Sequence, residues 1–340
     1  MQQGIALLNE NTAASLVEAV RFFDQALAIR TAAIVAGDHW LSYLTAASWM
    51  NRGDALTRLG QPAQIAEAVR SYDEALALMR AVPLEANPLY RRRLAIAWMN
   101  RGISWHEQET AAGFAEAAQS FEQAIAVVDG HPEHVLLLAC AWMNRGNALL
   151  RTAPPRLEEV RASAAAALKL LTEVEQQDLL AAETALKARY LICQAVAEWL
   201  ADQPATDYAF ELTSAATDAV EEGLRLARHW DARGERRFRP LAEDFFRFGM
   251  TAYRVHQPQF LAEFVIENLD PARPEASFSQ DPAMHRLAAE ALSAVARDLQ
   301  ADGYTTVRTP RFDSLLETLR ALQWMQSRLD VLRDRPMDTL

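Results

Sequence analysis

The hexapeptide Ala-Trp-Met-Asn-Arg-Gly stands at residues 97–102 and again at residues 141–146, and it stands at residues 48–53 with Ser in place of the first Ala. Three copies of one uncommon hexapeptide indicate an internal repeat. The final glycines of successive copies are 49 and 44 residues apart. A step of 49 residues back from the glycine of the first copy reaches Gly4, which places a further unit at the start of the chain.

A second pattern follows the glycine in three of these units. An Ala stands 15 residues after the glycine, an aromatic residue stands four positions later, and another Ala stands seven positions later. In one unit these residues are Ala68, Tyr72 and Ala75. Positions i, i+4 and i+7 share one face of an α-helix, and the Trp, Gly and Leu around each hexapeptide have the same spacing. Each repeat is therefore expected to be a hairpin of two helices.

These motifs resemble the tetratricopeptide repeat family. The resemblance rests on Trp49, Gly53 and Leu56 in the first helix of a repeat, and on the Ala, aromatic, Ala pattern in the second. It implies an all-α, right-handed superhelical solenoid of antiparallel helical hairpins, whose first helices line a concave groove. The period is longer than the family's usual 34 residues. A position that is usually Leu in the family is Arg in all three hexapeptides.

The repeat pattern fades along the chain. Regular repeats are expected over residues 1–177, where the first helix is incomplete because Gly4 already lies at its middle. Either the natural protein begins with half a helix, or the chain has been cut from a longer one. Degenerate hairpins are expected over residues 178–270, and a final helical pair over residues 283–340 is a candidate cap for the stack. Residues 270–282 are rich in Pro and are expected to form a linker.

Composition narrows the class of protein. The 340 residues are 51% apolar and carry a formal net charge of −11, which argues against a general binder of nucleic acid or anionic membranes. The sequence has no apolar run near the length of a membrane span and does not begin as a signal peptide. Cys140 and Cys193 lie in apolar helical stretches and are expected to be buried, reduced thiols. These features predict a cytoplasmic protein.

The predicted binding groove follows from the helical wheel. An α-helix turns through about 100° per residue, so the Asn two residues after each Trp lies about 200° from it, opposite the packed face. Residues five and nine positions after the Trp fall beside that Asn. The predicted peptide-binding groove therefore contains Asn51, Asp54, Arg58, Asn100, Ile103, Glu107, Asn144, Asn147 and Arg151. His106, beside Trp105, is a further candidate contact.

The resemblance gives the three asparagines a role. Repeats that resemble those of kinesin light chain carry an Asn at this place, which hydrogen-bonds the backbone of an extended peptide. A side-chain amide offers both a donor and an acceptor, so a row of amides can bind a peptide main chain whatever its sequence. The resemblance thus implies a non-catalytic interaction scaffold for a protein or peptide partner. The alternative is that Asn51, Asn100 and Asn144 bond to neighbouring helices or to water.

The arginines of the hexapeptides are expected to be structural. They fall at the edge of the packed face on the same wheel, and an acid follows the aromatic residue of each preceding second helix. Both are missing at the fourth step, where Ala165 and Gln194 stand. This covariation within one chain predicts three ion pairs between repeats: Asp24–Arg52, Asp73–Arg101 and Glu122–Arg145. Pairing within a repeat, with Glu67 and Glu116, is the alternative. Structural roles are also expected for Trp49, Gly53, Trp98, Gly102, Trp142 and Gly146.

A basic cluster suggests a different function. Six arginines lie within 15 residues: Arg225, Arg228, Arg233, Arg236, Arg237 and Arg239. They are a candidate phosphate or acidic-partner patch, which would suit a regulatory or sensor domain for a small ligand or nucleic acid. The alternative is a solvated connection whose arginines pair with Asp231 and Glu235.

Little in the sequence points to catalysis. His131 and His134 are three residues apart in a turn that holds Pro132, with no third ligand nearby, so no metal site is expected. The sequence contains no glycine-rich phosphate loop and no nucleophile motif. We expect no cofactor and no enzymatic activity.

Overall fold

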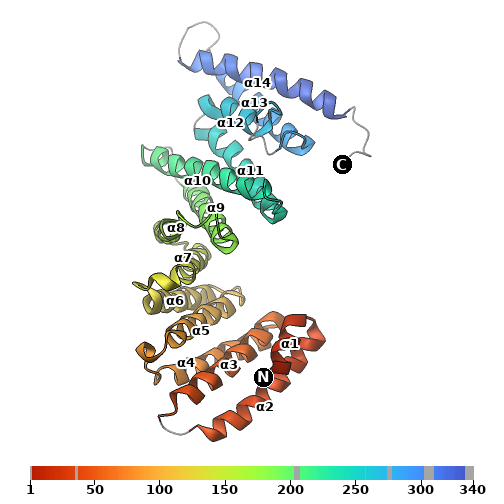
Figure 1. Ribbon diagram of the computed structural model, residues 1–340. Helices are drawn as coiled ribbons and strands as arrows, with labels where there is room; N and C mark the ends of the chain where they lie inside the picture. Colours follow the sequence, from red (N-terminus) through yellow and green to blue (C-terminus); the bar gives the residue numbers. More distant parts are fainter. Residues whose placement is uncertain are drawn as a thin grey trace. The chain divides into compact units, whose positions relative to one another are not determined.

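The computed structural model describes residues 2–34, 37–202, 207–256, 258–273, 278–301 and 310–333. Within these ranges the chain is built of α-helices and three short 3₁₀-helices, without a strand (Figure 1). It divides into two compact units, Met1–Leu191 and Ile192–Leu340, and the boundary falls inside α9 (Leu179–Asp202). No described helix has the length and apolar character needed to cross a membrane.

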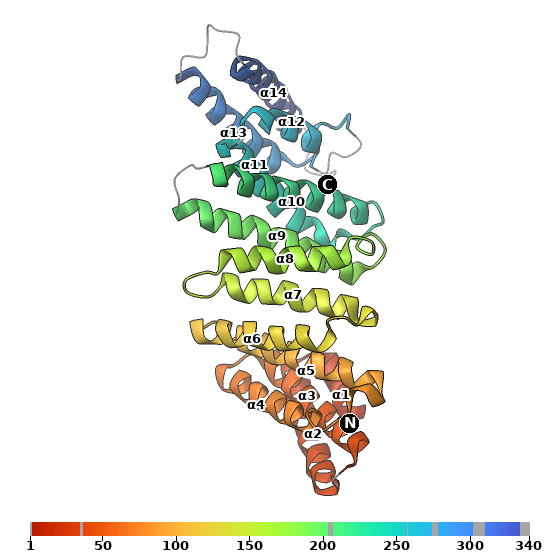
Figure 2. The ribbon, with the colours of Figure 1, turned by 90° about the vertical axis from the view of Figure 1, so that its left-hand side faces the viewer.

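The first unit consists of helical hairpins followed by the start of α9. The hairpins are α1 (Gln2–Glu10) with α2 (Ala13–Ala33), α3 (His39–Leu59) with α4 (Pro62–Met79), α5 (Pro88–His106) with α6 (Ala111–Val128), and α7 (Val135–Leu150) with α8 (Leu157–Leu171). Each pair of consecutive helices between α1 and α8 packs together (Figure 2). This serial packing is that of a helical solenoid, and it confirms the predicted all-α fold.

Local signals set where these helices begin and end. Thr12 accepts a hydrogen bond from the Ser15 backbone N–H, and the Ser15 side chain accepts one from the Thr12 N–H, so a capping box starts α2. Gly60 ends α3 with a left-handed φ of 73°, a conformation that glycine adopts without a steric penalty. Pro62 then opens α4, where its missing N–H leaves no helical hydrogen bond unmade.

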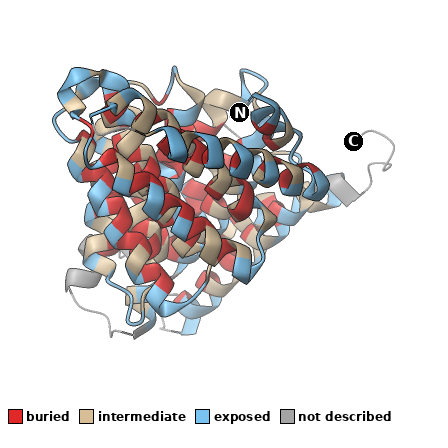
Figure 3. Ribbon diagram, turned by 90° about the horizontal axis from the view of Figure 1, so that it is seen from below, coloured by how far each residue is buried: buried red, intermediate tan, exposed pale blue. Residues whose placement is uncertain are grey.

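In most hairpins a glycine of the first helix packs against an aromatic ring of the second helix. A Cβ added at Gly4, Gly53 or Gly102 would lie 2.8, 2.7 and 2.7 Å from the rings of Phe23, Tyr72 and Phe121, respectively. These rings are among the largest fully buried side chains, and buried positions lie on the sides of the helices that face their neighbours (Figure 3). The absence of a side chain on glycine therefore allows the two helices to approach closely, while the ring fills the space between them.

The second unit keeps this geometry without the hexapeptide. It contains α10 (Asp207–Asp231), α11 (Arg239–His256), α12 (Pro258–Leu269), α13 (Pro282–Ala301) and α14 (Pro310–Arg333). A Cβ at Gly223 would lie 2.7 Å from the ring of Phe245, and one at Gly249 would lie 2.5 Å from the ring of Phe264. Helix α14 packs against both α12 and α13.

Two expectations need correction. Residues 270–282 were expected to form a linker, but Phe278 is 1% exposed and its ring centroid lies 5.1 Å from that of Phe246. An aromatic ring that leaves water contributes to the core, so this part of the segment belongs to the second unit. Cys193 is buried as predicted, whereas Cys140 is only half-buried and its Sγ lies 3.4 Å from the Thr184 hydroxyl.

Candidate functional site: the exposed face of α3, α5 and α7

Three equivalent asparagines lie on consecutive first helices. Helix α3 contacts α5, and α5 contacts α7. Asn51, Asn100 and Asn144 occupy the same position of the hexapeptide on these helices, and all three are half-buried. The hydroxyls of Thr57 and Ser104 are 2.7 Å apart and join α3 to α5 directly. The three asparagines therefore form one row across neighbouring helices, which we call the asparagine row.

The members of the asparagine row differ in their partners. Among the described residues, the amides of Asn51 and Asn144 make no hydrogen bond within the protein. Asn100 is hydrogen-bonded to the hydroxyl of Tyr72. Burial and the nearby charge of Asp54 raise the pKa of Tyr72, whereas its hydrogen bonds with Thr57 and Asn100 lower it. Two of the three amides thus have both donor and acceptor available.

Several predicted groove residues are engaged with one another. Arg58 donates two hydrogen bonds to the carboxylate of Asp54, each 2.9 Å long, so their charges largely compensate. The guanidinium of Arg151 lies 5.3 Å from the ring centroid of Phe114. Ile103, 38% exposed, leaves an apolar side chain open to solvent beside Asn100.

The imidazole of His106 lies at one end of this face. His106 Nε2 lies 3.4 Å from Asn147 Nδ2, and the His106 ring meets the edge of Phe114 at a centroid distance of 5.0 Å. Burial lowers the pKa of His106, and the charge of Glu107 only partly opposes that shift. A neutral imidazole is therefore favoured here at neutral pH. Sequence reasoning missed Phe114, because it lies on α6 and not on a first helix.

Exposed aromatic and apolar residues lie at the opposite ends of the same helices. Trp40 is 51% exposed and stacks on Tyr43 at 5.2 Å, and Arg93 donates a hydrogen bond of 2.8 Å to the Tyr43 hydroxyl. Leu89 is 48% exposed. Sequence reasoning missed these residues, although a signal was present. Trp40 and Leu89 each stand nine residues before the Trp of a hexapeptide, which is about half a turn from it and on the side of the Asn.

The hexapeptide arginines lie away from the asparagine row, in ion pairs between repeats. The side chains of Arg52, Arg101 and Arg145 are 12, 16 and 13% exposed, respectively. Their Nε atoms donate to Asp24, Asp73 and Glu122 at 2.6, 2.8 and 2.9 Å. The three predicted pairs are confirmed. The pairing within a repeat is present as well, with Glu67, Glu116 and Glu159.

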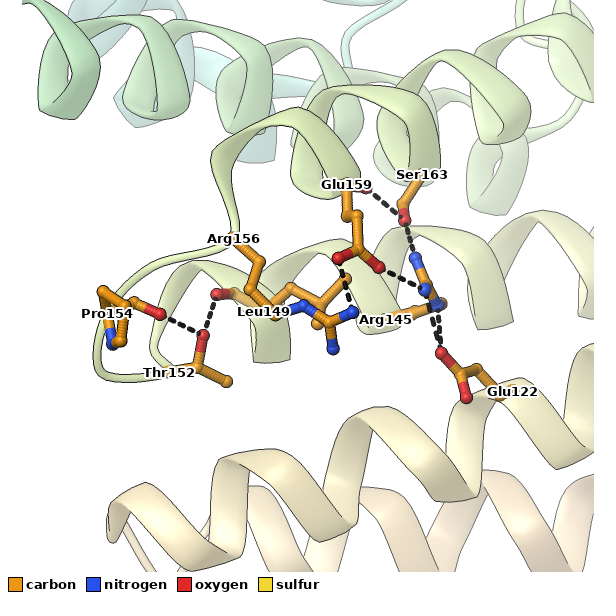
Figure 4. A network of polar contacts seen from close by, with 8 residues as sticks. All are labelled: Glu122, Arg145, Leu149, Thr152, Pro154, Arg156, Glu159 and Ser163. Carbon is orange, nitrogen blue, oxygen red and sulfur yellow. Dashed lines mark hydrogen bonds and ion pairs between the residues drawn. The ribbon is translucent and has the colours of Figure 1, made fainter.

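A serine completes each of these contacts. Arg145 Nη1 donates to Ser163 Oγ at 2.7 Å, and the Ser163 hydroxyl donates to the carbonyl of Glu159 at 2.7 Å (Figure 4). Ser71 and Ser120 accept from Arg52 and Arg101 in the same way. Sequence reasoning missed the serines. They stand just before the ring position of each second helix, and their hydroxyls satisfy donors that are otherwise shielded from water.

The arginine contacts make a testable prediction. Arg52→Ala removes the partner of Ser71, Asp24 and Glu67, and we expect it to lower the free energy of unfolding by about 1–2 kcal/mol because the two carboxylates remain partly solvated. Thermal unfolding followed by circular dichroism measures this change. Arg21→Ala is the matched control, since its pair with Glu18 is exposed. Weaker partner binding with an unchanged melting temperature would place Arg52 in the binding face instead.

The six arginines of the basic cluster are spread over the α10–α11 connection. Several contact a partner nearby in the sequence: Arg237 pairs with Glu235 at 3.0 Å, and Arg239 lies 3.9 Å from Glu243. Arg228 instead donates to Asn268 Oδ1 on α12 at 3.2 Å. Arg233 donates to the His229 carbonyl at 3.0 Å. The contacts of Arg233, Arg237 and Arg239 match a locally paired connection.

The histidine pair has a local carboxylate between its rings. His131 Nδ1 lies 3.4 Å from Glu133 Oε1, and the ring centroids of His131 and His134 are 6.4 Å apart. Among the described residues, no three His, Cys, Asp or Glu side chains come together as a metal site would require.

Comparison with known proteins gives a structural likeness but no match in sequence. No family model and no curated protein sequence matches the chain. The crystal structure of the de novo designed helical repeat protein DHR64 aligns with 88% of this chain and 100% of its own, at 16% identity and a TM-score of 0.18. A TM-score of 0.18 does not establish a shared fold. The fold assignment is therefore based on the packing of α1 to α8. This chain is a helical repeat protein.

Proposed function

We propose that the first unit is a protein-interaction module of the tetratricopeptide type, which binds an extended peptide or partner segment on the exposed face of α3, α5 and α7. The observation that carries this proposal is the asparagine row. Half-buried amides without an internal partner lose hydrogen bonds unless another molecule supplies them. A peptide main chain offers N–H and C=O groups at regular intervals and suits a row of repeated amides.

The flanks of the row favour an occupant with apolar side chains. Trp40, Leu89 and Ile103 are exposed along the same side of α3 and α5. Large rigid side chains such as Trp supply much of the binding energy of protein interfaces. The pairing of Asp54 with Arg58 leaves little net charge at this part of the face.

The test is affinity capture from a native lysate with the wild-type chain and the variant Asn51→Ala, Asn100→Ala, Asn144→Ala. We expect a partner that the wild type retains and the variant loses, at matched melting temperatures. The control changes three exposed amides on second helices, Gln25, Gln119 and Gln123, to Ala and should retain the partner. A partner that the asparagine variant holds as tightly as the wild type would remove the row from the binding face.

A further inference from the structure

A cavity of about 500 Å³ lies between α12 and α14 in the second unit. Small-molecule sites typically have volumes of about 300–1,000 Å³, so its size suits a small organic ligand. The segment around α12 contributes Ala262, Glu263, Ile266, Asp270 and Arg273, and α14 contributes Glu317, Arg320, Ala321 and Trp324. The positions on α14 are spaced by three, four and seven residues, so one face of this helix turns toward α12.

The cavity has an apolar part that can receive a hydrocarbon or an aromatic ring. Ala262 and Ala321 are 3 and 2% exposed. Ile266 and Trp324 line the same cavity and are half-buried, so part of each side chain remains accessible. An indole face binds both aromatic rings and cations.

Charges of both signs line the cavity without pairing. Among the described residues, the guanidinium groups of Arg273 and Arg320 make no ion pair and no hydrogen bond, and the carboxylates of Glu263 and Glu317 make none either. Many other arginines of the chain pair with an acid, as Arg237 does with Glu235. All four side chains are exposed, so charges of both signs are available to a ligand in this cavity.

We propose that this cavity binds a small zwitterion with an apolar body, of the class of apolar α-amino acids. A guanidinium matches a carboxylate in geometry and charge, so Arg273 and Arg320 receive the ligand's carboxylate. Glu263 and Glu317 receive its ammonium group, and Trp324 with Ile266 receives its side chain. A simple anion would be repelled by the acids, and a simple cation by the arginines. A ligand with both charges satisfies the two sets together.

This site lies wholly in the second unit and does not depend on peptide binding by the first. It places a small-ligand function at α12 and α14, whereas the sequence suggested the basic cluster for that role. The two proposals fail separately, because partner capture reports on the asparagine row and ligand titration reports on this cavity.

The test is calorimetric titration of the full chain with L-phenylalanine, L-leucine and L-tryptophan. We expect at least one of them to bind with one-to-one stoichiometry. The analogues 3-phenylpropanoate and 2-phenylethylamine each keep the ring of phenylalanine and lose one charge. We expect the corresponding analogue of a bound amino acid to bind at least about tenfold more weakly, because a charge-assisted hydrogen bond is lost. Equal binding of a single-charge analogue, or no binding of any of the three amino acids at millimolar concentration, would overturn the proposal.

Variants localise the binding. Arg320→Gln and Trp324→Leu should each weaken it about tenfold or more, and Trp324→Phe should retain most of it because a ring remains. Arg297→Gln makes the same change in charge at an exposed position of α13 outside the cavity, and it should bind as the wild type does. Circular dichroism establishes that each variant is folded. A loss in Arg297→Gln equal to that in Arg320→Gln would mean that net charge, and not this cavity, governs binding.

Discussion

Arg189→Met is expected to lower the free energy of unfolding of the first unit by about 3–5 kcal/mol, because it removes one partner of a buried ion pair. Arg189 donates from Nη1 and Nη2 to the two oxygens of Glu175 at 2.8 and 3.0 Å. The two side chains are only 6 and 9% exposed, so water compensates poorly for the lost contacts. Urea unfolding followed by circular dichroism measures the effect.

The same helix provides the matched control. Lys187 pairs with Glu183 on the surface of α9, where the two side chains are 51 and 34% exposed, and Lys187→Met should cost about 0.5 kcal/mol or less. The double variant Glu175→Leu, Arg189→Met removes both charges and should recover most of the stability. If Arg189→Met were no less stable than Lys187→Met, the burial of this pair would have no energetic consequence.

Repetition made part of this structure predictable. Each hexapeptide occupies an equivalent position in its repeat, so residues that change together from one repeat to the next can be recognised within this one chain. The acid and the arginine appear together in three steps and disappear together at Ala165 and Gln194, and the three predicted pairs are present. The hairpins followed from the same argument, since helical spacing recurs in each unit.

Features that occur once were beyond this reasoning. Neither Glu175 nor Arg189 belongs to a repeated motif, and Phe278 stands in a Pro-rich segment, so no pattern marked them as buried. The cavity between α12 and α14 joins residues more than 40 positions apart in sequence. A helical wheel identifies the face of a helix but does not identify the helix that lies opposite.

In the candidate site, too, the repeated features were predictable from the sequence and the individual contacts were not. The wheel placed Asn51, Asn100 and Asn144 together on one side of their helices, because the three share a motif. It gave no information on which groove residues contact each other, as Asp54 and Arg58 do. Side-chain pairing depends on rotamers and neighbouring helices, which spacing alone does not specify.

Ala in place of Gly102 is expected to destabilise the first unit, and Ala in place of Gly146 is expected to leave it unchanged or more stable. At Gly102 the new Cβ would lie 2.7 Å from the ring of Phe121, which is 1% exposed and cannot move into solvent. Overpacking of this kind costs about 1–3 kcal/mol. At Gly146 the nearest atoms would lie 3.4 Å away, since Ala164 stands where the other repeats have a ring. There the better helix propensity of Ala, about 1 kcal/mol, is unopposed.

Comparison of the two substitutions separates the effect of the contact with Phe121 from the effect of helix propensity. The same change is made at the same position of the hexapeptide, and only at Gly102 would the new Cβ meet a ring. Unfolding in urea should show Gly102→Ala less stable than Gly146→Ala by about 1–3 kcal/mol. Adding Phe121→Leu to Gly102→Ala should recover part of the loss, since the smaller side chain makes room for the Cβ, although Phe121→Leu alone is destabilising because it leaves a cavity. Strictly additive effects of Gly102→Ala and Phe121→Leu would contradict the contact, because residues that touch couple in a double-mutant cycle.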